Sequence, residues 1–273
     1  MVIFPNCKIN LGLHIISKRE DGFHNIETVF YPIQYIDALE IIQNSNALSP
    51  VLFTATGLTI NEKEENNLCS KAYYLLKKKF PDLPSIKMHL HKVIPMGAGL
   101  GGGSADAAFT LKLLNEKFNI SIPDNELIEY AAELGSDCPF FIINKPCFAT
   151  GRGEKLEELQ IDLSAYKIVL INPNIHVNTA WAFSQIAPAL PIKSVKEIIQ
   201  QPITTWANEL INDFENPLFE KYPEIKIIKE TLYKQGAVYA SMSGSGSTVF
   251  GILKKEQPVP KFKDSKYFVH TII

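Results

Sequence analysis

The first strand of the chain is predicted by an alternation of apolar and polar residues. Apolar side chains at every second position from Ile9 to Ile15 would face one side, whereas Lys8 and Asn10 would project together from the other. A solvated strand face is the ordinary interpretation of such a pair, but near a phosphate site the pair could also contact a nucleotide or a substrate. Further strands are predicted by similar alternation or by a short apolar run between turn residues. Two of them, 28–33 and 38–42, are expected to pair with each other. The others lie at 86–90, 166–172, 238–240, 248–253 and 266–273.

Apolar residues recur at helical spacing between these strands. A helix is expected from Leu68 to the run Lys77-Lys78-Lys79, whose charges suit the negative end of the helix dipole and would be solvated. A polar link at 61–67 precedes it. Further helices are expected from Gly103 or Ser104 to about 118, from 123 to a stop at Gly135, and at 178–183, 195–200, 206–213 and 224–235. The chain is therefore expected to mix helices and strands.

A glycine-rich loop lies between the strand at 86–90 and the helix that follows it. Five of the seven positions from Gly97 to Gly103 are glycine, which allows positive φ angles and a close approach of a ligand to the main chain. A strand, a glycine loop and a helix N-terminus together offer N–H donors and the positive end of a dipole, which suits a phosphate. A plain surface turn needs only one or two glycines.

Two other phosphate loops fit this sequence poorly. The P-loop ends in Gly-Lys, a pair that occurs nowhere in the chain. Gly97, Gly99 and Gly102 satisfy the dinucleotide pattern Gly-x-Gly-x-x-Gly, but Pro95 and Met96 separate the strand from the loop. The segment at 120–123 also ends in proline and not in the acidic residue that dinucleotide binding favours.

Composition narrows the classes of function. Of the 273 residues 46% are hydrophobic and 21% charged, and the net charge of −2 leaves no basic face for nucleic acid. No apolar run reaches membrane length, and the first four residues are too short and uncharged for a signal peptide, so we expect a cytoplasmic protein that binds no membrane. The four cysteines form no Cys-x-x-Cys pair and are expected to be reduced, partly buried thiols: Cys7, Cys69, Cys138 and Cys147.

Several single residues have both a structural and a functional interpretation. Phe23 and His24 follow an Asp-Gly turn and, taken alone, are ordinary packing and surface residues. Asp137 precedes a very apolar segment and is either a turn carboxylate or one aimed at a hydroxyl group. His89 and His91 share a strand face, but no third metal ligand is evident nearby, so a structural role is expected.

Two glycine-containing segments mark the second half of the chain. The turn from Gly151 to Glu154 is the expected boundary between a first domain, 1–152, and a second, 153–273. The tract from Ser241 to Ser247 consists almost entirely of small residues and lies between two short strands. It is the second place where backbone could approach a ligand closely.

Three stretches, in order and at suitable spacing, resemble the three motifs of the GHMP kinases: Pro5–Leu11, Pro95–Ser104 and Ser243–Ser247. Two more, Asp21–His24 and Leu134–Phe141, resemble the members of that family whose acceptor is 4-(cytidine 5'-diphospho)-2-C-methyl-D-erythritol, in the non-mevalonate route to isoprenoid precursors. This resemblance covers nearly the whole chain. It implies a two-domain α+β fold, with an N-terminal nucleotide domain and a ferredoxin-like C-terminal domain, present as a monomer or weak homodimer. The implied reaction transfers the γ-phosphoryl group of ATP, with Mg²⁺, to the 2-hydroxyl of that acceptor.

The resemblance also implies roles for particular residues. Lys8 and Asp137 match the catalytic pair, in which Asp137 accepts the hydroxyl proton while Lys8 keeps it ionised. ATP and phosphate contacts are implied at Lys92 and along the loop: Pro95, Met96, Gly97, Ala98, Gly99, Leu100, Gly101, Gly102, Gly103 and Ser104, with the Ser104 hydroxyl as a candidate Mg²⁺ ligand. Acceptor contacts are implied at Asn10, Phe23, His24, Thr179, Phe183, Gly244 and Gly246, where His24 reads the cytosine and Phe183 forms one wall of its slot.

The chain departs from the family pattern at two positions. Phe23 stands where the family usually has tyrosine; stacking needs only the ring, but a hydrogen bond from that position is lost. Ala98 replaces a glycine inside the loop, and its methyl group could point away from the phosphates. Three alternatives remain open: a homoserine- or mevalonate-type GHMP kinase, a dinucleotide-dependent oxidoreductase, and a non-catalytic nucleotide-binding protein of the same fold.

Overall fold

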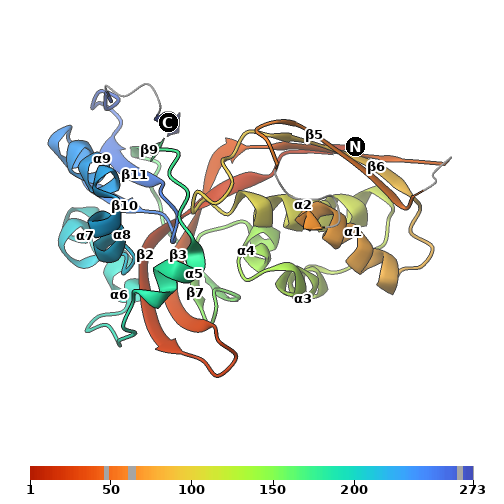
Figure 1. Ribbon diagram of the computed structural model, residues 1–273, viewed down its shortest axis with the longest axis horizontal. Helices are drawn as coiled ribbons and strands as arrows, with labels where there is room; N and C mark the ends of the chain where they lie inside the picture. Colours follow the sequence, from red (N-terminus) through yellow and green to blue (C-terminus); the bar gives the residue numbers. More distant parts are fainter. Residues whose placement is uncertain (46–48, 61–65, 263–266, 273) are drawn as a thin grey trace. The chain divides into compact units, whose positions relative to one another are not determined.

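The computed structural model describes residues 1–45, 49–60, 66–262 and 267–272 (Figure 1). The chain divides into two compact units that interleave along the sequence. Unit 1 comprises Met1–Cys7, Gln34–Met96 and Gly101–Lys145; unit 2 comprises Lys8–Ile33, Gly97–Leu100 and Pro146–Ile273. Each unit contains both helices and strands, as expected. The boundary expected near residue 152 stays a prediction about the family's domains.

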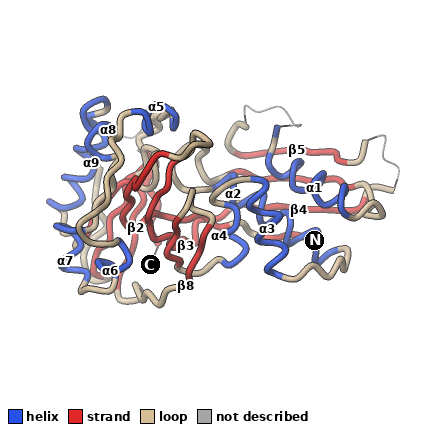
Figure 2. The backbone as a smooth tube through the Cα atoms, turned by 90° about the horizontal axis from the view of Figure 1, so that it is seen from below, coloured by secondary structure: helices blue, strands red, loops and turns tan. Residues whose placement is uncertain are grey.

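Unit 1 is a four-stranded sheet with helices on one face (Figures 1 and 2). Its strand order is β1-β4-β6-β5, antiparallel except for the parallel pair β5–β6. The strands are β1 (Val2–Ile3), β4 (Ala38–Gln43), β5 (Val51–Gly57) and β6 (Ile86–Lys92), and the helices are α1 (Leu68–Lys79), α2 (Gly102–Lys117), α3 (Asp124–Leu134) and α4 (Cys138–Ile143). All four strands precede α2 in the chain, whereas a dinucleotide-binding unit needs a parallel strand after that helix.

Unit 2 contains two four-stranded sheets. One has the order β2-β3-β7-β8 and the other, antiparallel throughout, β10-β11-β9-β12. The strands are β2 (Asn6–Lys18), β3 (His24–Ile36), β7 (Cys147–Thr150), β8 (Lys155–Glu158), β9 (Tyr166–Asn172), β10 (Tyr239–Met242), β11 (Val249–Lys254) and β12 (Phe268–Ile272). The helices are α5 (Thr179–Ser184), α6 (Val195–Ile199), α7 (Ile203–Glu209), α8 (Glu215–Lys221) and α9 (Pro223–Lys234).

Local signals explain the elements that match the sequence pattern. Asn67 caps α1 by accepting the Cys69 N–H at 2.9 Å, and α3 ends at Gly135 as expected. In α9 the residues at helical spacing, including Ile225, Ile228 and Leu232, belong to the buried core of unit 2. All four cysteines are buried, and none of them forms a disulfide bond. The polar link at 61–67 lies mostly outside the described residues.

The expected pairing of 28–33 with 38–42 is wrong. Strand β3 continues to Ile36 and β4 begins at Ala38, so only Asp37 separates them, and a hairpin needs at least two residues to reverse the chain. Strand β3 pairs instead with β2 and β7, while β4 pairs with β1 and β6 in the other sheet.

Other expectations differ in detail. The helix expected at 206–213 is α7, which ends at Glu209. Lys77 is not simply solvated, because its ammonium donates to the carbonyls of Pro81 and Leu83. His89 and His91 hydrogen-bond with Thr54 and Thr56 of β5, and their expected structural role stays a prediction. Among the described helices, none is both long and apolar enough to span a membrane.

Candidate active site

Lys8 and Asn10 are buried in unit 2 and do not line a solvated strand face, because β2 is covered on both faces from Lys8 to Ile15. The Lys8 ammonium donates to Asn10 Oδ1 at 2.6 Å and to the Gly99 carbonyl oxygen at 3.2 Å. Asn10 Nδ2 in turn donates to Thr28 Oγ1 at 3.0 Å. A buried ammonium requires such partners, so these side chains form a prearranged polar cluster beside the glycine loop.

The first half of the glycine loop packs against the small-residue tract. Ser243 Oγ donates to the Gly99 carbonyl oxygen at 2.8 Å. A Cβ atom on Gly99 would lie 1.9 Å from the Ser243 carbonyl oxygen, and one on Gly246 would lie 2.2 Å from the Gly99 nitrogen. The two glycines are therefore required because two backbones touch. The second and third motifs meet here, although nothing local in either stretch predicts the other.

Helix α5 connects this contact to an aromatic group. The Ser245 hydroxyl donates to Thr179 Oγ1 at 3.4 Å, and Gly244 lies against Asn10, whose Oδ1 would be 3.3 Å from an added Cβ. Thr179 and Phe183 are one helical turn apart and so share a face of α5. Unit 2 thus brings the polar cluster, the third motif and Phe183 together.

Phe183 stacks on His24, with ring centroids 4.9 Å apart and an interplanar angle of 19°. Its edge also packs on Phe214 at 4.9 Å. Burial, followed by the charge of Lys18, lowers the pKa of His24. A neutral imidazole has one donor and one acceptor nitrogen, which suits hydrogen bonding to the edge of a base. Phe23, the other expected aromatic, is a residue that is 51% exposed.

The second half of the loop belongs to unit 1 and leads into α2. This helix begins at Gly102, one residue earlier than expected, with Gly101 as its N-cap residue. Among the described residues no side chain caps its first turn, so its leading N–H groups remain available to an anion. Ser104 lies in that turn and is only partly buried.

Lys92 lies in the interior of unit 1. Ile86, Met88 and Leu90 face the core, and Lys92 continues the same face of β6 because side chains alternate. Its ammonium donates to Asp37 Oδ2 and, at 2.7 Å, to Asp106 Oδ2. A contact between Lys92 and a nucleotide stays a prediction, but its charge is held by two buried carboxylates.

The two carboxylates of this ion cluster have different surroundings. Asp37 Oδ1 accepts the N–H groups of Val93 and Ile94, which lead into the glycine loop. Asp106 Oδ1 has no hydrogen-bond partner among the described residues. Burial, opposed by Lys92 and helped by Asp37, raises the pKa of Asp106 to about 7. The cluster thus joins the end of β6 to the first turns of α2.

Asp137 occupies the N-cap position of α4, and its side chain does not cap that helix. The next residue, Cys138, begins α4, which packs against α2 within unit 1. Burial raises the pKa of the Cys138 thiol to about 12. Asp137 therefore lies at the start of a helix that packs on the helix following the glycine loop.

Three residues of the site carry no sequence signal that singles them out. Thr28 lies in an ordinary strand pattern, and Ser243 is one of several small residues in its tract. Asn212 falls in a segment expected to be helical, yet its Nδ2 donates to the carbonyls of Met242 at 3.0 Å and Gly244 at 2.9 Å. Only the fold shows that Asn212 holds the third motif, that Ser243 joins this motif to the glycine loop, and that Thr28 holds Asn10.

Comparison with known proteins gives matches over most of the chain. Residues 67–145 match the model of the GHMP kinases N-terminal domain, and residues 195–265 match that of the GHMP kinases C-terminal domain. The chain is 53% identical over 261 residues to 4-diphosphocytidyl-2-C-methyl-D-erythritol kinase of Bacteroides fragilis, covering 96% of this chain and 95% of that one. It is 48% identical to the protein of the same name from Parabacteroides distasonis, covering 98% and 96%.

Solved structures resemble the fold. A crystal structure of 4-(cytidine 5'-diphospho)-2C-methyl-D-erythritol kinase superposes with a TM-score of 0.77 at 30% identity, covering 94% of this chain and 91% of that one. The mevalonate kinase of Methanococcus jannaschii superposes with a TM-score of 0.68 at 14% identity, covering 94% and 92%. The second likeness concerns the fold alone.

Proposed function

This chain belongs to the GHMP kinase family, and we propose that it phosphorylates the 2-hydroxyl group of 4-(cytidine 5'-diphospho)-2-C-methyl-D-erythritol. Family membership makes it an ATP-dependent small-molecule kinase with the two-domain GHMP fold. The observation that supports the acceptor is the 53% identity, over 96% of the chain, to a relative named for that substrate. The stack of His24 on Phe183, carried by the same helix as Thr179, fits a cytidine acceptor.

The glycine loop is proposed to hold the triphosphate of ATP. The uncapped first turn of α2 offers N–H donors and the positive end of a 16-residue helix. The loop backbone from Pro95 to Ser104 would follow the phosphates, with its first half fixed on Ser243 and Gly246. Ala98 is buried, so its methyl group would not block the side of the loop on which the neighbouring residues contact the phosphates.

Asp137 and Lys8 are proposed as the catalytic residues. Each lies near one half of the loop within its own unit: Lys8 donates to the Gly99 carbonyl, and Asp137 precedes α4, which packs on α2. In the reaction the bond from the γ-phosphorus to ADP breaks, a bond to the acceptor oxygen forms, and the hydroxyl proton passes to Asp137. Lys8 would offset negative charge on the moving phosphoryl group, since such transfers are governed by position and charge.

Mg²⁺ is part of the proposal, and the donor set fits it. The described residues contain no cluster of three or more His, Cys, Asp or Glu that could hold a metal by itself. Mg²⁺ in kinases usually binds one or two protein oxygens together with substrate phosphates, and Ser104 is the candidate protein ligand. When bound, the ion neutralises charge on the phosphate oxygens.

The acceptor is tested by measuring ADP release from MgATP with a panel of alcohols. We expect turnover with the cytidine acceptor and a strong loss in kcat/KM with 2-C-methyl-D-erythritol 4-phosphate, which lacks the cytidine. Homoserine and mevalonate serve as the acceptors of the rival kinases. Comparable kcat/KM with either of these, or indifference to the missing cytidine, would overturn the proposed acceptor while leaving the kinase class intact.

The location in the cell and the oligomeric state of the enzyme are also proposed. Four buried cysteines that form no disulfide bond fit a reducing compartment, and we propose a cytoplasmic location. A monomer or weak homodimer is proposed as its state in solution, which light scattering at two protein concentrations would test.

A further inference from the structure

The turn between β2 and β3 presents the Phe23 ring to solvent on a well-formed backbone. The Arg19 N–H donates to the Phe23 carbonyl at 2.8 Å, and the Gly22 N–H donates to the Arg19 carbonyl at 3.2 Å. Asp21 Oδ1 accepts the Phe23 N–H at 3.1 Å. Phenylalanine has no hydroxyl group with which to anchor itself, so the orientation of this half-exposed ring depends on what touches its face.

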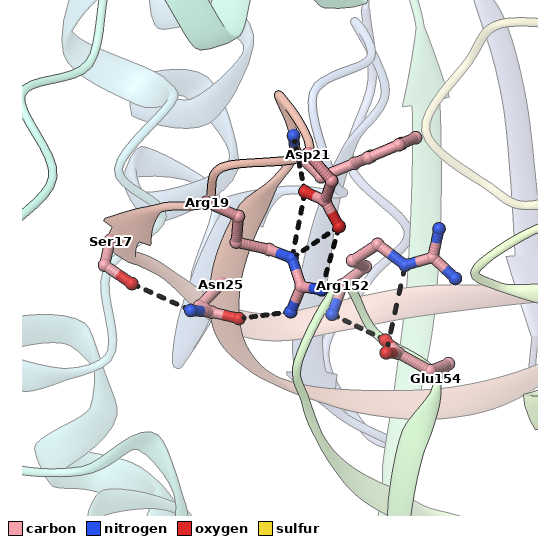
Figure 3. A network of polar contacts seen from close by, with 7 residues as sticks. Ser17, Arg19, Asp21, Asn25, Arg152 and Glu154 are labelled. Carbon is pink, nitrogen blue, oxygen red and sulfur yellow. Dashed lines mark hydrogen bonds and ion pairs between the residues drawn. The ribbon is translucent and has the colours of Figure 1, made fainter.

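Arg152, from the turn between β7 and β8, touches that face. Its guanidinium carbon lies 5.0 Å from the centroid of the Phe23 ring, within the range of a cation–π contact. Glu154 holds Arg152 in turn: its Oε2 accepts the Arg152 N–H at 2.5 Å, and its Oε1 lies 3.8 Å from Arg152 Nε (Figure 3).

A second arginine stiffens the same turn from within. The Arg19 guanidinium donates to Asp21 Oδ2 from Nη2 at 2.8 Å and from Nε at 3.0 Å. Its Nη1 donates to Asn25 Oδ1 at 3.1 Å, and Asn25 Nδ2 donates to Ser17 Oγ at 2.8 Å (Figure 3). The Arg19 hydrogen bonds lower the pKa of Asp21.

The charges of this network balance: two arginines face two carboxylates, so it gathers no excess positive charge with which to attract an anion. What the network does provide is a hydrogen-bonded turn and an arginine over the Phe23 ring, one residue before His24, which stacks on Phe183. Resting on the proposed function, we propose that Arg152, anchored by Glu154, is a positioning residue that holds the Phe23 ring as the flat surface on which the cytosine of the acceptor stacks.

The test measures the binding of CDP by calorimetry together with the KM values for acceptor and ATP. An exposed cation–π contact corresponds to about a two- to fivefold change in affinity. Arg152→Met, which keeps the length and removes the charge, should therefore weaken CDP binding and raise the acceptor KM by about that factor. The KM for ATP should not change, and Arg152→Lys should restore part of the affinity. Glu154→Gln weakens the anchoring of Arg152 and should therefore cause a smaller loss of CDP affinity.

A double-variant cycle shows whether Arg152 acts through Phe23. In a Phe23→Leu background, Arg152→Met should cause no further loss of CDP affinity, since the ring it holds is gone. Lys196, which lies 5.8 Å from the Phe148 ring elsewhere in unit 2, is the matched control: Lys196→Met should leave CDP binding unchanged. Thermal unfolding of each variant identifies any loss caused by misfolding.

Two results would overturn the inference alone: unchanged CDP binding in Arg152→Met, or an equal loss with and without the Phe23 ring. A wild-type enzyme that turns over ATP with another acceptor and does not bind CDP would overturn the proposed acceptor and this inference together. The two failures are therefore distinguishable.

Discussion

Replacing Lys92 by methionine tests the buried ion cluster of unit 1. The side chains of Lys92, Asp37 and Asp106 are 1%, 0% and 4% exposed, so solvent screens their interactions little. With one cation and two carboxylates, the cluster is negatively charged if all three groups are ionised. The substitution removes the only ammonium that the described residues place in contact with both carboxylates.

The substitution should lower the free energy of unfolding, because it leaves two carboxylates buried without a cation. Breaking a buried ion pair on one side costs about 3–5 kcal/mol, a large fraction of the roughly 5–15 kcal/mol by which a protein of this kind is stable. Asp37 keeps the N–H groups of Val93 and Ile94, which favours the lower half of that range at pH 8.

The loss should depend on pH. The pKa of Asp106 is raised in the folded state to about 7, mainly by burial. The raised pKa of Asp106 contributes stability that is fully present below the pKa of the unfolded chain, near 3.8. This contribution is lost as the pH rises through about 7. Without Lys92, which opposes protonation, Asp106 binds a proton more readily at pH 5.5. The variant should therefore lose less free energy of unfolding at pH 5.5 than at pH 8.

The assay is urea unfolding at pH 5.5 and pH 8, followed by far-UV circular dichroism, because both tryptophans lie in unit 2. Lys79→Met is the control, because Lys79 pairs with Glu133 at 3.7 Å with 39% and 54% of the side chains exposed; its loss should stay below about 0.5 kcal/mol. Asp106→Asn leaves the Lys92–Asp37 pair intact and should flatten the pH dependence. A loss below about 1 kcal/mol for Lys92→Met at pH 8, or equal losses at both pH values, would refute the reasoning.

Three further predictions concern the site. Asp137→Asn should lower kcat at least about tenfold, since a positioned base contributes roughly 10²–10⁴-fold, with the Kd of ATP little changed; a near-normal kcat would reduce Asp137 to an orienting group. Gly99→Ala should destabilise the protein and raise the KM of ATP far more than the control Gly22→Ala. Both glycines have a φ of +83°, but only at Gly99 would the added methyl group clash with backbone. Equal effects of the two substitutions would contradict this account. Asn212→Ala should cost about 1–3 kcal/mol in urea unfolding, because two buried carbonyls lose their donor, and a loss below about 0.5 kcal/mol would argue against it.

Local patterns located many elements but not their partners. Strand β9 has the expected bounds, and α3 and α9 lie within one residue of theirs, because apolar spacing, prolines and glycines act within a few residues. Strands β5, β7 and β8 and helices α4 and α8 were not expected. Strand β8, for example, is mostly exposed and charged, and its backbone pairs with β7.

The sequence alone determined that this chain has a glycine-rich loop that is predicted to bind phosphate, a helix behind it, and motifs that resemble those of one kinase family. Those features depend on residue type and spacing over short distances. Only the tertiary structure decided that Lys8 is buried with Asn10, that Gly99 touches Ser243, and that Lys92 lies between two carboxylates. Each of these depends on segments far apart in the chain meeting in space, and burial then sets which charges need partners and which glycines cannot carry a side chain.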